Sequence, residues 1–184
     1  MNESRSKNDA MDESELRMQL ELHHHASYGW AAACCAKAPE LAEDVLQTAY
    51  LKVLRGLARY DGRSTFKTWL FGVIRMTAVD EQRRQWLRVF RLSSQEGEPE
   101  MHLPDCGDRL DQSARSGMFR EALARLPKRQ QEVMHLVFYQ DLSLQEASHI
   151  MGVSLGSART HYERGKSRLR AMLEKSEYFN EYRR

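Results

Sequence analysis

Apolar residues recur at steps of three and four positions along most of the chain, which is the period of an α-helix. No run of alternating apolar and polar residues bounded by turns interrupts this pattern, so the sequence predicts an all-α fold. The clearest helix begins at Pro39, a residue that the first turn of a helix tolerates, and continues through Leu57. Glu40, Glu43 and Asp44 then place negative charge at the positive end of the helix dipole.

The same period predicts a helix on each side of this one. The first occupies about residues 13–37 and ends before the proline. The other follows an Asp-Gly turn signal, has Ser64 or Thr65 as its cap, and runs to about residue 88. These helices form a predicted first domain, residues 1–92.

The composition changes between residues 93 and 116. Acidic residues outnumber basic ones there, and proline and glycine are interspersed, so we expect a flexible acidic linker. The helical period returns over residues 117–184, with a break at Pro127, and predicts a second domain. The expected architecture is therefore two small helical domains joined by that linker. Its acidic residues include Glu96, Glu98, Glu100, Asp105, Asp108 and Asp111.

Residues 142–170 have the pattern of a helix-turn-helix. Ser143 and Glu146 match a capping box, which would begin a first helix. Gly152 can adopt the left-handed backbone that ends this helix, and Ser154 can cap a second one. Two helices joined by so short a turn can place the second helix in the major groove of DNA.

The second of these helices, from Leu155 to Arg170, carries several arginine and lysine residues against the single acid Glu163. Its first turns can bring side chains to base edges, where one bidentate arginine contact with guanine gives about 1–3 kcal/mol of discrimination. Cations further along the helix are placed to contact the phosphates of the DNA backbone, which position the protein without reading the sequence. A solvated basic face without specific binding is the alternative interpretation. The predicted DNA contacts are Ser157, Arg159, Thr160, His161, Arg164 and Lys166.

Residues 66–84 interleave aromatic side chains with cations, among them Trp69 and Arg75. This combination suits single-stranded nucleic acid, because bases stack on the rings while the backbone meets positive charge. The alternative is a core helix with a solvated cationic side. For Phe66 and Leu70 taken alone, burial in the core is the favoured interpretation.

Three stretches, in this order, resemble the bacterial RNA polymerase sigma factors of the extracytoplasmic function (ECF) group. They are AEDVLQTAYLKVL at 42–54, FKTWLFGVIRMTAVDEQRR at 66–84, and LARLPKRQQEVMHLVFYQDLSLQEASHIMGVSLGSARTHYERGKSRLRAML at 123–173, and they span most of the chain. The resemblance implies a protein that binds core RNA polymerase, brings it to a promoter and helps to open the DNA. In such proteins the helix-turn-helix reads the −35 element as duplex.

The resemblance also implies two sets of contacts in the first domain. The family's equivalent of residues 41–54 meets a coiled coil of the largest polymerase subunit, and its next helix and loop recognise the −10 element as a melted non-template strand. The family often has Asn where this chain has Met76, and Glu where it has Thr48. The implied polymerase contacts are Glu43, Asp44, Leu46, Gln47 and Tyr50, and the implied −10 contacts are Lys67, Trp69, Arg75, Asp80, Arg83 and Arg84.

A further partner implied by the resemblance is an anti-sigma protein, often membrane-bound in this family. The chain itself has no stretch of roughly 20 apolar residues, and its N-terminus lacks the apolar core of a secretory signal, so we expect it in the cytoplasm. Its three cysteines provide no disulfide framework. Adjacent helical residues point about 100° apart, so neither the histidines at 23–25 nor the cysteines at 34–35 are expected to bind a metal. We expect no cofactor and no small-molecule substrate.

Two other classes of function account for less of the sequence. A stand-alone helix-turn-helix regulator would use only residues 142–170, would usually bind palindromic duplex DNA as a dimer, and would have no need of residues 66–84. An enzyme is not expected, because no nucleophile is paired with a base in a recognisable spacing and no glycine-rich phosphate loop occurs.

Overall fold

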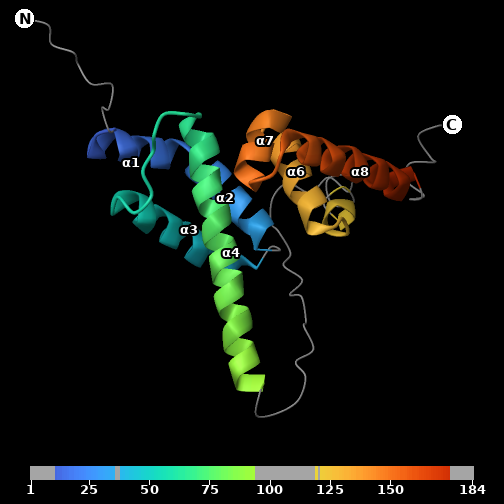
Figure 1. Cartoon of the computed structure of the whole chain (residues 1–184), viewed down its shortest axis with the longest axis horizontal. Coiled ribbons are helices and arrows are strands. Elements are labelled where there is room, and N and C mark those ends of the chain that lie inside the picture. Colours follow the sequence, from blue (N-terminus) through green and yellow to red (C-terminus); the bar gives the residue numbers. More distant parts are fainter. Residues whose placement is uncertain (1–10, 36–37, 94–118, 120, 175–184) are drawn as a thin grey trace, which may run out of the picture.

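Helices and the turns between them make up the residues that the computed structural model describes, 11–35, 38–93, 119 and 121–174 (Figure 1). Over these residues the predicted all-α fold is confirmed. The predicted linker at 93–116 lies outside the described residues except for Ser93. The helices are α1 (Glu13–Leu22), α2 (His24–Cys34), α3 (Pro39–Leu54) and α4 (Phe66–Ser93) in the first domain, and α6 (Lys128–Phe138), α7 (Leu144–Met151) and α8 (Leu155–Glu174) in the second.

The first domain departs from the expected pattern at two places. The helix expected over 13–37 breaks at His23, whose φ of −98° and ψ of 4° end α1 and begin α2. Consecutive histidines favour a helix only weakly, which makes this a ready point for a break. The other difference is that α4 continues to Ser93. The cap of α4 is Thr65, whose hydroxyl accepts the backbone N–H of Thr68 at 3.2 Å.

The core of the first domain is built around Trp30, which is fully buried. Its indole Nε1–H donates to the carbonyl of Phe71 at 3.0 Å, so the polar group of the side chain is satisfied. The two rings also stack, with their centroids 6.0 Å apart. Phe66 and Leu70 are buried as well, which confirms the core interpretation for these two residues. Together these contacts fix α2 against α4.

The second domain has the caps that the sequence predicts. Ser143 and Glu146 form both halves of the capping box, and Gly152 ends α7 with a φ of 63°. The hydroxyl of Ser154 accepts the backbone N–H of Ser157 at 3.1 Å at the start of α8. The helix-turn-helix prediction is therefore confirmed as a local structure, and it fixes which side of α8 turns outward.

The two domains lie against each other and share one continuous apolar core. α7 packs beside α4, and α6 packs beside α2 (Figure 1). The C-terminal turns of α4 project beyond the rest of the first domain (Figure 1), and Trp86 is exposed there. The packing places one side of α4 against the second domain, so part of the first predicted DNA-binding region is covered, whereas the outer side of α8 stays exposed.

Candidate nucleic-acid and polymerase interfaces

The outward side of α8 carries most of the residues predicted to read duplex DNA. Ala158, Gly165 and Leu169 are buried on its inner side. At Gly165 a Cβ atom would lie only 3.2 Å from Cγ of Met134 in α6, so the two helices approach closely because this residue has no side chain. The exposed residues of the predicted set are Ser157, Arg159, Thr160, Arg164 and Lys166, and His161 is half-buried.

Aromatic and backbone contacts hold parts of this side in place. The Tyr162 ring stacks on Phe138 with centroids 6.0 Å apart, and Nζ of Lys166 lies 6.0 Å from the centroid of the Tyr162 ring. The hydroxyl of Thr160 donates to the Gly156 carbonyl at 2.9 Å, which leaves its oxygen free to accept a bond. α8 is therefore a well-supported helix that presents cations to solvent.

The residues predicted to read the −10 strand do not form one surface. Lys67 and Arg75 point toward the second domain, where Nζ of Lys67 donates to the carbonyl of Gln140 at 2.8 Å. Nε of Arg75 lies 3.4 Å from Oε1 of Glu132, and the Arg75 residue is only 7% exposed. At this separation the contact is an ion pair rather than a well-formed hydrogen bond.

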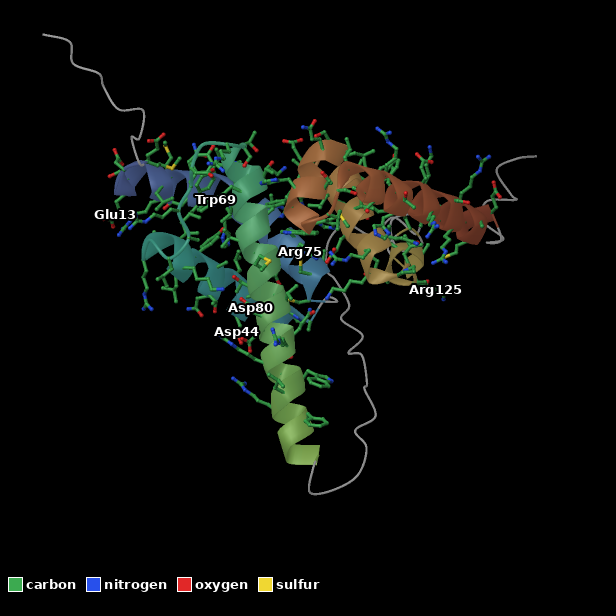
Figure 2. All side chains as sticks on the ribbon, viewed as in Figure 1. Glu13, Asp44, Trp69, Arg75, Asp80 and Arg125 are labelled. Atoms are coloured by element: carbon green, nitrogen blue, oxygen red, sulfur yellow. The ribbon has the colours of Figure 1, made fainter. Side chains whose placement is uncertain are left out.

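The rest of that set lies on other sides of α4, along which Trp69, Arg75 and Asp80 follow one another (Figure 2). Trp69 is half-buried, with its ring centroid 5.2 Å from that of Phe66 and 5.4 Å from that of Tyr60. Asp80 pairs with Lys52 of α3 at 3.6 Å. The two remaining members, Arg83 and Arg84, are exposed.

An acidic groove runs between α3 and α4, which pack against each other, on the side that carries the predicted polymerase contacts. It has a volume of about 160 Å³ and is lined by Asp44, Gln47 and Glu81 together with nearby threonines. Sequence reasoning did not select Glu81, although it lies one helical turn after a residue whose side chain is buried against α3, Thr77. The groove gives this side of the first domain a negative character.

The five predicted polymerase contacts differ in exposure. Glu43, Asp44 and Gln47 are exposed. Leu46 is 5% exposed, so its side chain supports this surface from within the core. Tyr50 is half-buried, its hydroxyl lies 3.4 Å from the carbonyl of Leu20, and burial raises its pKa.

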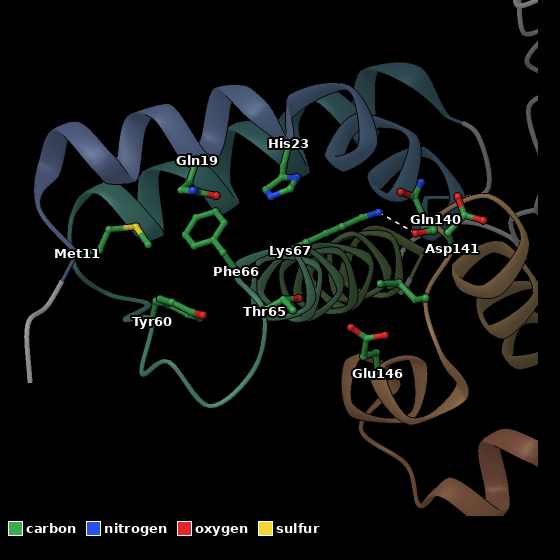
Figure 3. Close-up of a pocket in the computed structure, with 11 residues that line it drawn as sticks. Met11, Gln19, His23, Tyr60, Thr65, Phe66, Lys67, Gln140, Asp141 and Glu146 are labelled. Atoms are coloured by element: carbon green, nitrogen blue, oxygen red, sulfur yellow. Dashed lines mark hydrogen bonds between the residues drawn. The ribbon is translucent and has the colours of Figure 1, made fainter. Parts of the chain in front are cut away.

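A cavity of about 640 Å³ opens between the two domains (Figure 3). His23, Phe66 and Lys67 line it from the first domain, and Asp141 and Glu146 line it from the second. Burial, and then the charge of Lys67, lowers the pKa of His23. The backbone N–H and then the hydroxyl of Ser143 are the main reasons why the pKa of Glu146 is lowered, with smaller contributions from Thr68 and Lys67.

Sequence reasoning did not identify the second-domain residues that meet α4. Glu132 is 3% exposed and also pairs with Arg129 at 3.3 Å. Gln140 lies just after α6, and its carbonyl accepts the bond from Lys67. A signal for Glu132 exists in the helical period, because its spacing of four from the core residue Leu136 puts an acid on a buried side. Such a placement indicates a partner cation, but it does not say which one.

The histidine and cysteine clusters do not converge in the described part of the chain. Across those residues, no group of three or more His, Cys, Asp or Glu side chains is arranged to hold a metal ion. Burial raises the pKa of Cys34 well above its ordinary value and that of Cys35 to about 11, so both thiols are protonated at neutral pH. None of the helices among the same residues is long and apolar enough to cross a membrane.

Comparison with known proteins covers both domains. The family models Sigma-70 region 2 and Sigma-70 region 4 match residues 20–88 and 122–171. RNA polymerase sigma factor YlaC of Bacillus subtilis is 30% identical over 138 residues, which are 74% of this chain and 80% of the relative. ECF RNA polymerase sigma factor SigX of the same species is 31% identical over 141 residues, 72% of this chain and 70% of the relative.

Two solved structures share the fold. The chain is similar to the sigma factor RpoE in complex with the anti-sigma factor NepR from Bartonella quintana, with a TM-score of 0.69 and 23% identity over 89% of this chain and 99% of that one. It is also similar to CnrH in complex with the cytosolic domain of CnrY, with a TM-score of 0.59 and 19% identity over 90% of this chain and 92% of that one.

Proposed function

The chain belongs to the sigma-70 family of RNA polymerase sigma factors, in the ECF group, and from this premise we propose which of its surfaces carry out each part of transcription initiation. It is an alternative sigma factor that directs transcription initiation at promoters. Sigma factors are initiation factors that act with core RNA polymerase rather than catalysts. The exposure and contacts of the described residues support each of these residue assignments.

The outer side of α8 reads the −35 element as duplex DNA. The observation that carries this assignment is that Arg159, Thr160 and Arg164 are exposed on a helix whose other side is packed against α6. Arg159 and Thr160 lie in the N-terminal turns, which reach base edges in helix-turn-helix complexes. Lys166 and other cations further along contact phosphates.

The acidic groove between α3 and α4 meets core RNA polymerase. Glu43, Asp44 and Gln47 supply exposed polar groups, and Glu81 adds a carboxylate that the resemblance did not suggest. A groove of this charge fits a basic partner surface, because complementary charges raise the association rate and fix the register of the two proteins.

The −10 element, as a melted strand, is read by α4 and the loop before it. The half-buried rings of Tyr60 and Trp69 offer faces for stacking above the buried ring of Phe66, and Lys67 and Arg75 offer cations on the adjacent side. Arg83 and Arg84 contact the strand's phosphates further along the helix. Asp80 orients Lys52, with which it is paired.

An anti-sigma protein is a further partner. The two solved structures most useful for comparison hold sigma factors of this fold with anti-sigma factors, which supports such a partner for this chain. We extend the proposal to a membrane-bound anti-sigma protein that covers the acidic groove, and to a site of action in the cytoplasm, where the polymerase is found.

Co-elution with core RNA polymerase tests the assignment of the acidic groove. The wild-type protein is expected to co-elute with core enzyme that lacks any other sigma factor, and Asp44→Lys is expected to weaken this association. Glu121→Lys, which reverses an exposed charge in the second domain, serves as the matched control and should co-elute normally. Failure of the wild-type chain to co-elute, together with tight binding to duplex DNA on its own, would favour the stand-alone regulator.

A further inference from the structure

We propose that Met76 determines part of the sequence specificity of the first domain, by contacting the 5-methyl group of a thymine in the melted −10 strand. Val79 extends the apolar surface that this methyl group meets. The inference rests on the proposed role of α4 in reading that strand, and it adds a base contact to that role.

Met76 lies on a side of α4 that is open to solvent. The residue is 57% exposed, and Val79, one turn further along, is 39% exposed. Met76 directly follows Arg75 in the helix, and so it points about 100° away from the residue that pairs with Glu132. A DNA strand can therefore reach the Met76 side chain in the structure as it stands.

The position of Met76 is aligned with two residues already assigned to the strand. Trp69, Met76 and Arg83 are spaced by seven residues, about two helical turns, so they lie on the same side of α4. At 1.5 Å per residue each interval is about 10 Å, roughly the length of three stacked nucleotides. Trp69 provides a half-buried ring at one end, and Arg83 provides an exposed cation at the other. Met76 thus lies midway between a stacking contact and a phosphate contact, where the bases of a bound strand pass.

The charges around Met76 suit a polyanion. Asp80, one turn after Met76, pairs with Lys52 of α3 at 3.6 Å (Figure 2). Glu81 pairs with Arg84 at 3.6 Å. Both carboxylates are therefore compensated, and the exposed arginines of this part of α4 give it a positive balance. The surface combines apolar contact with a charge that complements a phosphate backbone.

The chemistry of the methionine side chain limits the kind of base that it can read. Its thioether has no N–H or O–H to donate and its sulfur is a weak acceptor, so it cannot recognise the donor and acceptor pattern of a base edge. Thymine offers a 5-methyl group, which apolar side chains contact in protein–DNA complexes. A cytosine at this place would bring its amino group against Met76 and Val79, and it would lose hydrogen bonds to water without replacement.

An exposed methionine can also have no binding role, because single apolar residues are common on protein surfaces. α1 provides such a residue for comparison, since Met18 is 58% exposed, almost the same as Met76. Met76 differs in its place, because it lies between two assigned strand contacts and next to the exposed Val79. Met18 is therefore the matched control.

Replacement of thymine by uracil tests the contact directly, because the two bases differ only in the methyl group. Core polymerase supplemented with this protein transcribes genomic DNA, and the 5′ ends of the transcripts locate a promoter. Duplexes of that promoter are then made with an unpaired −10 region, in which each thymine of the non-template strand is replaced in turn by uracil. Fluorescence anisotropy measures the binding of the holoenzyme to each duplex.

We expect uracil at one position to weaken binding by the wild-type holoenzyme about fourfold, which is the effect of one buried methyl group. Met76→Gln, a side chain of similar length with an amide end, should bind the thymine and uracil forms equally at that position. Met76→Leu keeps an apolar side chain and should retain the preference. Met18→Gln should behave as the wild type does.

Equal binding of every uracil form by the wild type, or an unchanged preference in Met76→Gln, would overturn the inference and leave the proposed function intact. A −10 region without thymine would do the same. Loss of co-elution of Met76→Gln with core polymerase would assign Met76 to the polymerase interface, which also contradicts the inference. A wild-type protein that directs no transcription would instead overturn the proposed function, and this inference with it.

Discussion

The outer side of α8 and the side of α4 that faces the second domain are both polar, cation-bearing surfaces, yet one is exposed and the other is covered. On α8 the inner side is satisfied within its own domain by small and apolar residues, Ala158, Gly165 and Leu169. On α4 the cations Lys67 and Arg75 take their partners from another domain. The comparison teaches that the same residue types can be exposed or already paired, and that only packing decides between these states.

The largest expected effect comes from removing the first domain's core side chain while leaving α8 unchanged. Trp30 is fully buried and touches both Phe71 and His135, so Trp30→Ala should cost about 3–5 kcal/mol of unfolding free energy. Chemical denaturation followed by circular dichroism measures this. Trp86→Ala, at an exposed position of α4, should change stability by less than about 0.5 kcal/mol. Similar losses for both variants would contradict the assigned core.

An intermediate effect is expected from Arg159→Ala, which separates duplex reading from the packing of the two domains. Loss of a bidentate base contact should weaken binding to a duplex with the −35 element by about 1–3 kcal/mol. Because Arg159 is exposed on α8 and takes no part in the contacts between α4 and the second domain, the radius of gyration should stay at the wild-type value. Fluorescence anisotropy with a labelled duplex, and small-angle scattering on the same samples, check the two halves. Unchanged duplex affinity would remove Arg159 from the set of base contacts.

The smallest effect concerns pH where α7 meets α4, at Glu146. The hydrogen bonds from Ser143 lower the pKa of Glu146 below the ordinary glutamate value of 4.5, so its carboxylate is favoured in the folded state. This contribution to stability is therefore fully present above the ordinary value and is lost as the pH falls through the lowered, folded-state pKa. Urea denaturation of wild type and Glu146→Gln should show a stability difference at pH 7 that shrinks at pH 3. A pH-independent difference would contradict the carboxylate's role.

Local elements of the second domain follow closely from the sequence. Ser143, Glu146 and Gly152 form the predicted cap and turn because capping bonds and left-handed glycine depend on residues only a few positions apart. The same holds for the cap of α4 at Thr65. The break at His23 was not expected, because no proline or glycine marks that point in a stretch that otherwise has helical period.

The candidate sites were less predictable from the sequence. The sequence identified Arg75 and Lys67 as candidate DNA contacts. It could not show that Arg75 pairs with Glu132 and that Lys67 donates to the carbonyl of Gln140, since these partners are 57 and 73 positions away along the chain. It also placed Leu46 among polymerase contacts, whereas the packing of α3 buries that side chain. Spacing along a helix shows on which side of that helix a residue lies, but it does not show which other element covers that side.

The sequence by itself determined most of the helices, the caps of α4, α7 and α8, the helix-turn-helix and the resemblance to ECF sigma factors, because each depends on short-range spacing or on the order of motifs. Only the tertiary structure decided that the outer side of α8 is exposed and that the side of α4 with Lys67 and Arg75 is covered by the second domain. The physical reason is that burial and ion pairing between domains depend on contacts between residues far apart in the chain, and helical period does not say which residue such a partner is.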